Sequence, residues 1–134
     1  AGGGKYMAIL QCRKTVHTDE GKQRQAALLA FSAFPELKHV ILVDEDVDIF
    51  DTNDVLWAMN TRFQGDRDII TIPGVRCHPL DPSSCPEYTG SIRDVGCSTK
   101  TIFDCTVPFE LKEKFKRAAF KDVEVKHWLP DFEL

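Results

Sequence analysis

HVILVDEDVDIFDTNDVLWAMNTR, residues 39–62, joins an apolar run, an acidic segment and an amphipathic segment. Residues 40–43 are all aliphatic, which is typical of a strand that is covered on both faces in a parallel sheet. Asp51 or Thr52 can cap a helix that begins near Asn53. Helical spacing then predicts a face toward the sheet that consists of Val55, Leu56, Met59 and Phe63. The stretch therefore predicts a buried strand, an acidic turn and a helix packed on the sheet.

Strands and helices are predicted to alternate through the first half of the chain. Residues 6–11 read as a strand, and residues 18–34 as a helix that opens with capping side chains and ends before Pro35. Its predicted sheet-facing stripe consists of Ala27, Ala30, Phe31 and Phe34. Residues 68–72 supply a third strand, which a Pro-Gly pair ends. We therefore expect an α/β fold, a three-layer αβα sandwich with a mostly parallel sheet.

The second half of the chain is less regular. Residues 73–97 are rich in Pro, Ser, Gly and Cys, and they predict a long loop that is functional, held by a partner or disordered. Residues 109–120 predict a basic amphipathic helix, and the final residues 123–134 carry large apolar side chains that need another surface. We expect an α/β domain over residues 1–107, followed by a C-terminal helical arm with a docking tail over residues 108–134.

Composition narrows the classes of partner. The 134 residues carry a formal net charge of -4 with interspersed signs, which gives no reason to expect nucleic acid or a membrane surface as partner. No apolar run approaches the roughly 20 residues that a membrane span requires. The five cysteines form no CxxC pair, so we expect reduced thiols, no metal site and a cytoplasmic location. Cys12 and Cys105 are expected to be small core residues.

Several blocks in consistent order resemble the C-terminal part of the UbiD-type carboxy-lyases. The blocks are VDEDVDIFD, NDVLWAMNTR, DRDIITIPG and LDPS, and the resemblance covers about residues 5–106. The segments PGVRCHPLDPS and TIFDCTVPF are similar to those of hydroxybenzoate and gallate decarboxylases. The resemblance implies a reversible, non-oxidative decarboxylation of aromatic, hydroxylated acids. It also implies prenylated flavin mononucleotide (prenylated FMN) as electron sink and a carboxylic acid that transfers the proton.

The resemblance further implies that these residues are one part of a longer enzyme. In the family a flavin-binding domain comes first and carries the catalytic arginine and glutamates, so no catalytic residue is expected here. Manganese and potassium ions accompany the flavin in the family, with ligands mostly outside this chain. We expect this part to support a homo-oligomer and to close the active site over an aromatic acid. A chain that starts almost directly in a strand, AGGGKYMAIL, agrees with a fragment.

Four residues are candidates for the site, and two of them, Lys14 and Leu80, match functional positions of the family. Lys14, beside Arg13 and a helix opening, is the expected contact to the flavin phosphate, although the glycine-histidine pair usual after it is not clearly present. The alternative for Lys14 is a solvated loop residue. His78 and Leu80 follow the third strand, where α/β proteins bind ligands, and they are expected at the substrate pocket. Lys100 either belongs to a turn and contact segment or reaches an active-site anion.

The acidic segment after the second strand allows a rival interpretation. Its carboxylates are Asp44, Glu45, Asp46, Asp48 and Asp51. We expect them mainly as caps, turn formers and ion-pair partners for residues such as Arg62 and Arg67. Asp44 and Asp46 after an apolar strand could instead hold a manganese or magnesium ion, as in nucleotide-sugar glycosyltransferases. A purely structural oligomerisation domain is a further alternative. The additional matching blocks favour the carboxy-lyase.

Overall fold

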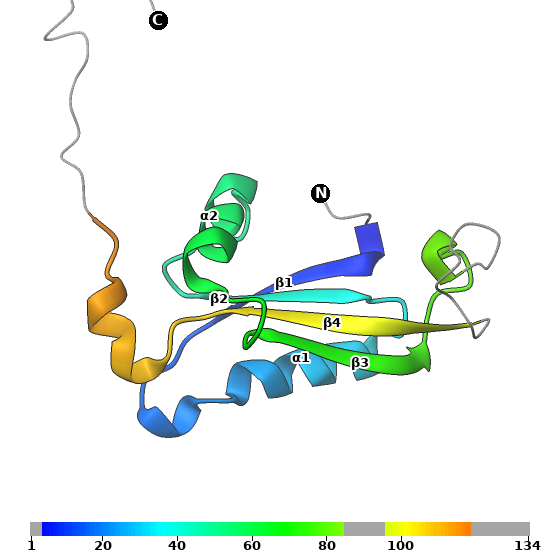
Figure 1. The fold of residues 1–134 in the computed structure, drawn as a ribbon, viewed down its shortest axis with the longest axis horizontal. Coiled ribbons are helices and arrows are strands. Elements are labelled where there is room, and N and C mark those ends of the chain that lie inside the picture. Colours follow the sequence, from blue (N-terminus) through cyan, green and yellow to red (C-terminus); the bar gives the residue numbers. More distant parts are fainter. Residues whose placement is uncertain (1–3, 85–95, 119–134) are drawn as a thin grey trace, which may run out of the picture.

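A mixed sheet between two helices forms the body of the protein (Figure 1). The computed structural model describes residues 4–84 and 96–118. The helices and strands are β1 (Met7–Cys12), α1 (Lys22–Ala33), β2 (His39–Asp44), α2 (Thr52–Arg62), β3 (Ile69–Arg76) and β4 (Cys97–Cys105). Short 3-10 segments are η1 (Gly4–Tyr6), η2 (His17–Asp19), η3 (Pro82–Ser84) and η4 (Phe109–Phe115). No helix in these residues is long and apolar enough to span a membrane.

The four strands lie in the order β1-β2-β4-β3. Strand β2 is parallel to both of its neighbours, with Leu42 opposite Leu10 on one side and opposite Asp104 on the other. Strand β3 runs antiparallel to β4, and its pairing shifts between Ile72 and Val75. Strands β1 and β3 are the edges of this open sheet. Helices α1 and α2 cover opposite faces, so the predicted αβα layers and mostly parallel sheet are confirmed.

The core has two halves because successive side chains of a strand point to opposite faces. The half under α1 consists of Ala27, Phe31, Leu37, Val40, Leu42 and Ile102. The half under α2 consists of Ile41, Val43, Val47, Val55, Ala58 and Cys105. Strand β2 contributes to both halves, which explains why residues 40–43 are all aliphatic. Cys105 is fully buried and Cys12 packs against the first half, as predicted.

Helix α1 begins later than the predicted residues 18–34. The segment η2 precedes it, and Gly21 has a φ of 90°, in the left-handed region that favours glycine. The carboxylate of Asp19 accepts hydrogen bonds from the main-chain N–H groups of Thr15 (2.8 Å) and Val16 (3.2 Å). These bonds fold the residues before the helix into a separate turn. Helix α2 starts as predicted, and the Asp51 side chain accepts from the N–H of Asn53.

Two side chains predicted to face the sheet are largely exposed. Phe34 is 64% exposed because the chain leaves the helical conformation at this residue, and Leu56 is 48% exposed. Ala58, which the spacing did not select, is fully buried where α2 meets the sheet. The prediction is confirmed for Ala27, Ala30 and Phe31 of α1, for Val55 and Met59 of α2 and for Phe63 directly after α2.

The predicted loop over residues 73–97 contains more structure than expected. Strand β3 continues to Arg76, and β4, which the sequence interpretation missed, pairs with both β2 and β3. Strand β4 mixes apolar residues with Lys100, Thr101 and Asp104, all three of them buried. Because β3 is antiparallel, the residues after it lie at the amino ends of the other strands. The expectation that they follow a ligand-binding carboxyl edge is wrong.

The C-terminal arm is described only in its first part. Residues 109–115 form the 3-10 segment η4 instead of the predicted amphipathic α-helix over residues 109–120. The predicted docking tail, residues 123–134, lies outside the described residues. The division of the chain at residue 107 therefore stays a prediction.

Because β2 is enclosed, shortening one of its buried side chains should lower the stability of the fold. Leu42→Ala removes a side chain with no exposed surface, and we expect a loss of about 2 to 5 kcal/mol in the free energy of unfolding. The matched control is Leu29→Ala, because Leu29 is 70% exposed on α1 and should lose little. Urea unfolding of the 134-residue chain measures both variants. Equal losses for the two would contradict the described core.

Candidate functional site

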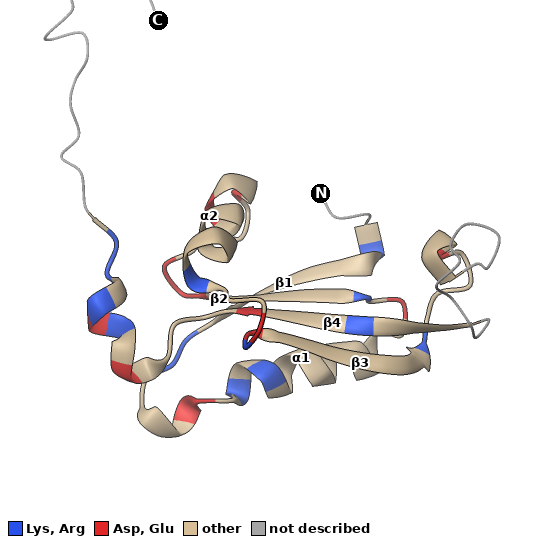
Figure 2. Ribbon diagram, in the orientation of Figure 1, with Lys and Arg blue, Asp and Glu red and all other residues tan. Residues whose placement is uncertain are grey.

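Polar side chains gather at both ends of the sheet. The carboxyl edge is here the end of the sheet at which β1, β2 and β4 finish. The amino edge is the end at which these three strands start. Charged residues are concentrated at the carboxyl edge, near η2, η4 and the base of α2 (Figure 2). The residues predicted from sequence divide between the two edges and the interior.

A buried arginine holds two aspartates at the carboxyl edge. Arg62, the last residue of α2, donates through Nη1 to Asp44 Oδ2 (3.0 Å) and through Nη2 to Asp46 Oδ2 (2.6 Å). The Asp44 side chain is 5% exposed and that of Arg62 is 2% exposed. Burial raises the pKa of Asp44, although the N–H of Val107 and Arg62 favour its charged form. The hydrogen bonds from Arg62 lower the pKa of Asp46.

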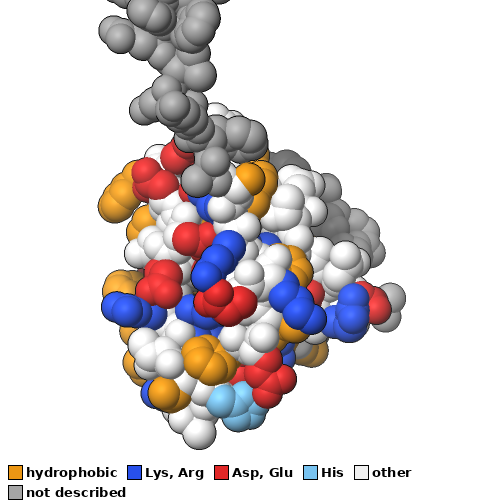
Figure 3. Space-filling view, turned by 90° about the vertical axis from the view of Figure 1, so that its left-hand side faces the viewer, with side chains coloured by type: hydrophobic (Ala, Val, Ile, Leu, Met, Phe, Trp, Pro, Cys, Tyr) orange, Lys and Arg blue, Asp and Glu red, His pale blue; other side chains and the backbone are white. Residues whose placement is uncertain are grey.

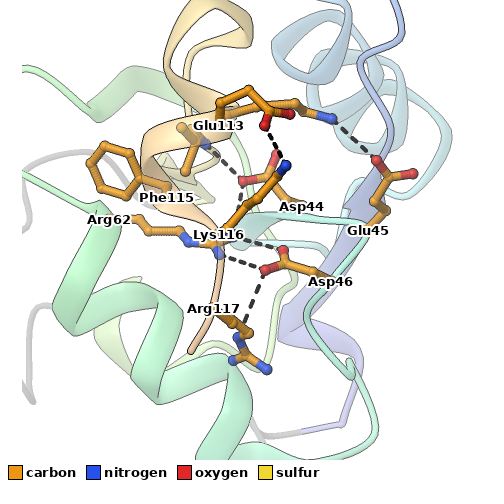
Figure 4. A pocket seen from close by; sticks show the side chains of 10 residues that line it. Asp44, Glu45, Asp46, Arg62, Glu113, Phe115, Lys116 and Arg117 are labelled. Carbon is orange, nitrogen blue, oxygen red and sulfur yellow. Dashed lines mark hydrogen bonds and ion pairs between the residues drawn. The ribbon is translucent and has the colours of Figure 1, made fainter. Parts of the chain in front are cut away.

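The segment after β4 closes over this group (Figure 4). Lys112 of η4 donates to Glu45 Oε1 (3.2 Å), and Arg117 pairs with Asp46 and Asp54. The guanidinium of Arg117 also lies 3.8 Å from the ring centroid of Trp57. A cavity of about 430 Å³ remains, lined by Asp44, Glu45, Asp46, Arg62, Val107, Lys112, Glu113, Phe115, Lys116 and Arg117.

These charges largely neutralise one another. Figure 3 looks onto the carboxyl edge and shows acidic and basic side chains interleaved across it. The predicted partnership with Arg62 is confirmed. Among the described residues Arg67 pairs with its neighbour Asp66 (3.5 Å) and not with the acidic segment, so that part is wrong. Arg62 occupies Asp44 and Asp46, and residues 4–84 and 96–118 contain no cluster of three or more His, Cys, Asp or Glu that could hold a metal ion. The metal-binding alternative has no support here.

Lys14 lies inside the carboxyl edge. It is 4% exposed, and its Nζ donates to Glu20 Oε2 (3.1 Å) and to the carbonyl of Val107 (3.0 Å). Glu20 also accepts from the N–H of Phe109, so this pair ties the segment after β1 to the segment after β4. A phosphate contact by Lys14 would require breaking these bonds. The contact stays a prediction.

Lys100 is an interior residue of β4. Its ammonium donates to the carbonyls of Pro35 (2.7 Å) and Leu37 (2.5 Å) and lies 5.2 Å from the ring centroid of Phe31. Desolvation by burial lowers its pKa. These contacts hold the connection between α1 and β2. The described contacts of Lys100 include no anion, so its predicted role toward an active-site anion stays untested.

His78 and Leu80 lie at the amino edge. The N–H of Asp81 donates to the carbonyl of His78 (3.0 Å) and closes a tight turn through Pro79, whose ring suits the second position of such a turn. Leu80 is 78% exposed on this turn. Its N–H donates to His78 Nδ1 (3.0 Å), so neutral His78 is assigned the tautomer with its proton on Nε2. The turn therefore presents an apolar side chain next to a ring N–H.

Lys5 joins this turn and was missed by the sequence interpretation. Its Nζ lies 2.7 Å from His78 Nε2, and the Tyr6 ring meets His78 edge-on, with 5.9 Å between centroids. Lys5 itself is exposed. It precedes His78 by 73 residues and follows three glycines, a context with no pattern that points to a site. The reversed direction of β3 brings the two residues together.

Comparisons with known proteins agree with this geometry. A family model for the 3-octaprenyl-4-hydroxybenzoate carboxy-lyase C-terminal domain matches residues 1–105. Gallate decarboxylase of Lactiplantibacillus plantarum is 63% identical over 124 residues, which are 92% of this chain and 25% of that protein. The chain thus spans about a quarter of the length of that relative.

Solved structures show the same relationship. The apo 3,4-dihydroxybenzoic acid decarboxylase of Klebsiella pneumoniae has a TM-score of 0.83 and 60% identity, over 98% of this chain and 27% of that one. The UbiD-class enzyme HmfF from Pelotomaculum thermopropionicum, solved in complex with FMN, has a TM-score of 0.73 and 33% identity, over 87% of this chain and 24% of that one.

Removing the positive charge of the buried Asp44–Arg62 ion pair should destabilise the fold strongly. Arg62→Met leaves Asp44 buried without a counter-charge, and we expect a loss of about 3 to 5 kcal/mol in the free energy of unfolding. The double variant Asp44→Asn, Arg62→Met should recover part of it, since no uncompensated carboxylate then remains. Arg67→Met, at an exposed pair, serves as control in urea unfolding. A wild-type midpoint for Arg62→Met would refute the described role of the pair.

Proposed function

This chain belongs to the UbiD family of carboxy-lyases, and on that premise we propose that it is the C-terminal domain of a decarboxylase of aromatic, hydroxylated acids that uses prenylated FMN. Two relatives support the substrate class, because their names give gallate and 3,4-dihydroxybenzoic acid as what they act on. Both identities, 63% and 60%, extend over nearly the whole chain.

The observation that carries the proposal is the turn with His78 and Leu80. Leu80 is exposed but held on a closed turn, which suits packing against the apolar face of an aromatic ring. The Nε2–H of His78 can donate to a phenolic oxygen at the rim of that ring. The ammonium of Lys5, 2.7 Å from His78 Nε2, is itself a donor and cannot accept this proton. An oxygen of the substrate would therefore be a better hydrogen-bond partner for the Nε2–H. The turn thus combines apolar contact with one directional hydrogen bond.

The cofactor fits the amino edge better than the carboxyl edge. Exposed Lys5 makes one contact to the described residues and keeps donor capacity for a phosphate, whereas the ammonium of Lys14 is internally bonded. We therefore favour Lys5 over Lys14 as the contact to a flavin phosphate. When bound, prenylated FMN would supply the electron sink for the departing carboxylate. Ligands for its manganese and potassium ions would come from outside this chain.

The chain's own share in the reaction is to bind, orient and exclude water. Leu80 would cover the aromatic ring of the substrate and keep water from the reacting carbon. His78 would orient that ring by donating to a hydroxyl group of the substrate. Proton transfer would belong to the family's carboxylic acid in the preceding, flavin-binding domain. That domain is the proposed partner of the amino edge. A homo-oligomer, joined through residues 123–134, completes the proposal.

Carbon dioxide release tests the proposed activity. The full-length protein, reconstituted with prenylated FMN, should decarboxylate gallate or 3,4-dihydroxybenzoate, while residues 1–134 alone should release none because the acid is missing. Failure of the full-length protein on a panel of hydroxybenzoates would leave the purely structural role as the better description. Turnover by residues 1–134 alone would contradict the division of labour.

Leu80 should control substrate preference. In the full-length enzyme, Leu80→Ala should change the ratio of kcat/KM between gallate and 3,4-dihydroxybenzoate by about 10-fold, since pocket contacts carry roughly 1 to 3 kcal/mol of discrimination. The matched control is Leu29→Ala, because Leu29 is an exposed leucine on α1, outside the turn. Equal losses on both substrates, parallel to a lower melting temperature, would assign Leu80 a structural role.

A further inference from the structure

We propose that Lys38 and Asp81 form a latch that positions His78 and Leu80 for the substrate. This inference rests on the proposed function of that turn and assigns positioning residues to it. The latch joins the turn to the start of β2, and its parts come from segments 43 residues apart.

Asp81 holds the turn from both sides. Asp81 is the last residue of the turn: its main-chain N–H donates to the carbonyl of His78, and its carbonyl accepts from the N–H of Ser84 (3.0 Å). Its carboxylate accepts from the N–H (3.0 Å) and the hydroxyl (2.8 Å) of Ser83. Asp81 is only 5% exposed, which is unusual for a carboxylate in a loop. One buried residue therefore connects the turn to η3.

Lys38 fixes Asp81 to the sheet. Its Nζ lies 3.0 Å from Asp81 Oδ2 and also contacts the hydroxyl of Ser83. The main chain of Lys38 donates to the carbonyl of Tyr6 (2.8 Å) and accepts from the N–H of Thr101 (3.0 Å). The main chain of Lys38 is therefore hydrogen-bonded both to the residue before β1 and to β4, and we call this connection the link. The same link carries Tyr6, whose ring meets His78.

Within residues 4–84 and 96–118, the other side-chain contacts of the turn are those of His78 with Lys5 and Tyr6. Leu80 is exposed and His78 is half-buried, so apolar burial contributes little to the conformation of the turn. Although Asp81 is buried, the hydrogen bonds from Lys38 and Ser83 keep its pKa below the usual range. Its carboxylate is therefore charged at neutral pH and bound to a charged partner, which strengthens the hydrogen bonds. Loss of the latch should release the turn without disturbing either half of the core.

The test compares variants of the full-length enzyme. Asp81→Asn and Lys38→Met remove one charge each, and Lys38→Arg is the conservative variant expected to restore function in part. The matched control is Lys112→Met, because Lys112 is 24% exposed and pairs with Glu45 at 3.2 Å at the opposite edge, close to the 20% and 3.0 Å of Lys38 with Asp81. The readouts are kcat and KM for two hydroxybenzoates, melting temperature and hydrogen exchange at the Leu80 amide.

We expect Asp81→Asn and Lys38→Met to lower kcat/KM by about 10- to 100-fold, as small misplacements of positioning groups do. The ratio between the two substrates should change, the Leu80 amide should exchange faster, and the melting temperature should stay near that of Lys112→Met. Slow exchange at Leu80 together with control-like kinetics would overturn the latch. Losses that are equal for both substrates and follow the melting temperature would also overturn it.

Hydrogen exchange separates this proposal from the proposed function. If the wild-type enzyme releases no carbon dioxide from any acid, the proposed function fails, but the exchange rate at Leu80 still decides whether Lys38 and Asp81 hold the turn. If the enzyme is active and the exchange rate is unchanged in both variants, the latch fails alone.

Discussion

Strand β2 is enclosed on every side, by β1 and β4 along its edges and by the two helices over its faces. A polar side chain in an enclosed strand loses its hydrogen bonds to water, so it is tolerated only where protein groups replace them. In β2 the polar residues, His39 and Asp44, stand at the two ends of the strand. Asp44, at the last position of β2, has the charge of Arg62 beside it, and Arg62 and the N–H of Val107 both donate to its Oδ2. Its Oδ1 is buried without a hydrogen-bond partner among the described residues.

The antiparallel direction of β3 places the turn with His78 at one end of the sheet and the ion pairs of Arg62 at the other. If β3 ran parallel to its neighbours, the turn with His78 would lie at the carboxyl edge, among the ion pairs of Arg62. Its reversal places the turn beside Lys5 and Lys38 instead, where fewer charges compete for a ligand. The carboxyl edge is then free to serve stability, with η4 tied across it through Lys112 and Glu20. The proposed function accordingly uses the amino edge.

The sequence predicted what local pattern determines. The aliphatic run 40–43 and the cap at Asp51 depend on neighbours in sequence, and both were recognised. Strand β4 was not, because its polar residues find partners that are distant in the chain: Lys100 at the carbonyl of Leu37, and Asp104 at Arg24 (2.6 Å). Such partners convert residues that suggest a loop into residues of a central strand. Lys5 was overlooked for the same reason, since His78, the ring that its ammonium contacts in the described part of the chain, is 73 residues away.

The two edge strands differ in how they resist unwanted pairing. Strand β3 contains Pro73 and an irregular register between Ile72 and Val75, and both interrupt the row of main-chain groups that another strand would need. Strand β1, MAILQC, has no charge, no proline and no such interruption. Its outer row of N–H and carbonyl groups is a regular template for one more strand. Aggregation of the domain, wherever β1 is left uncovered, should therefore start by pairing along that edge.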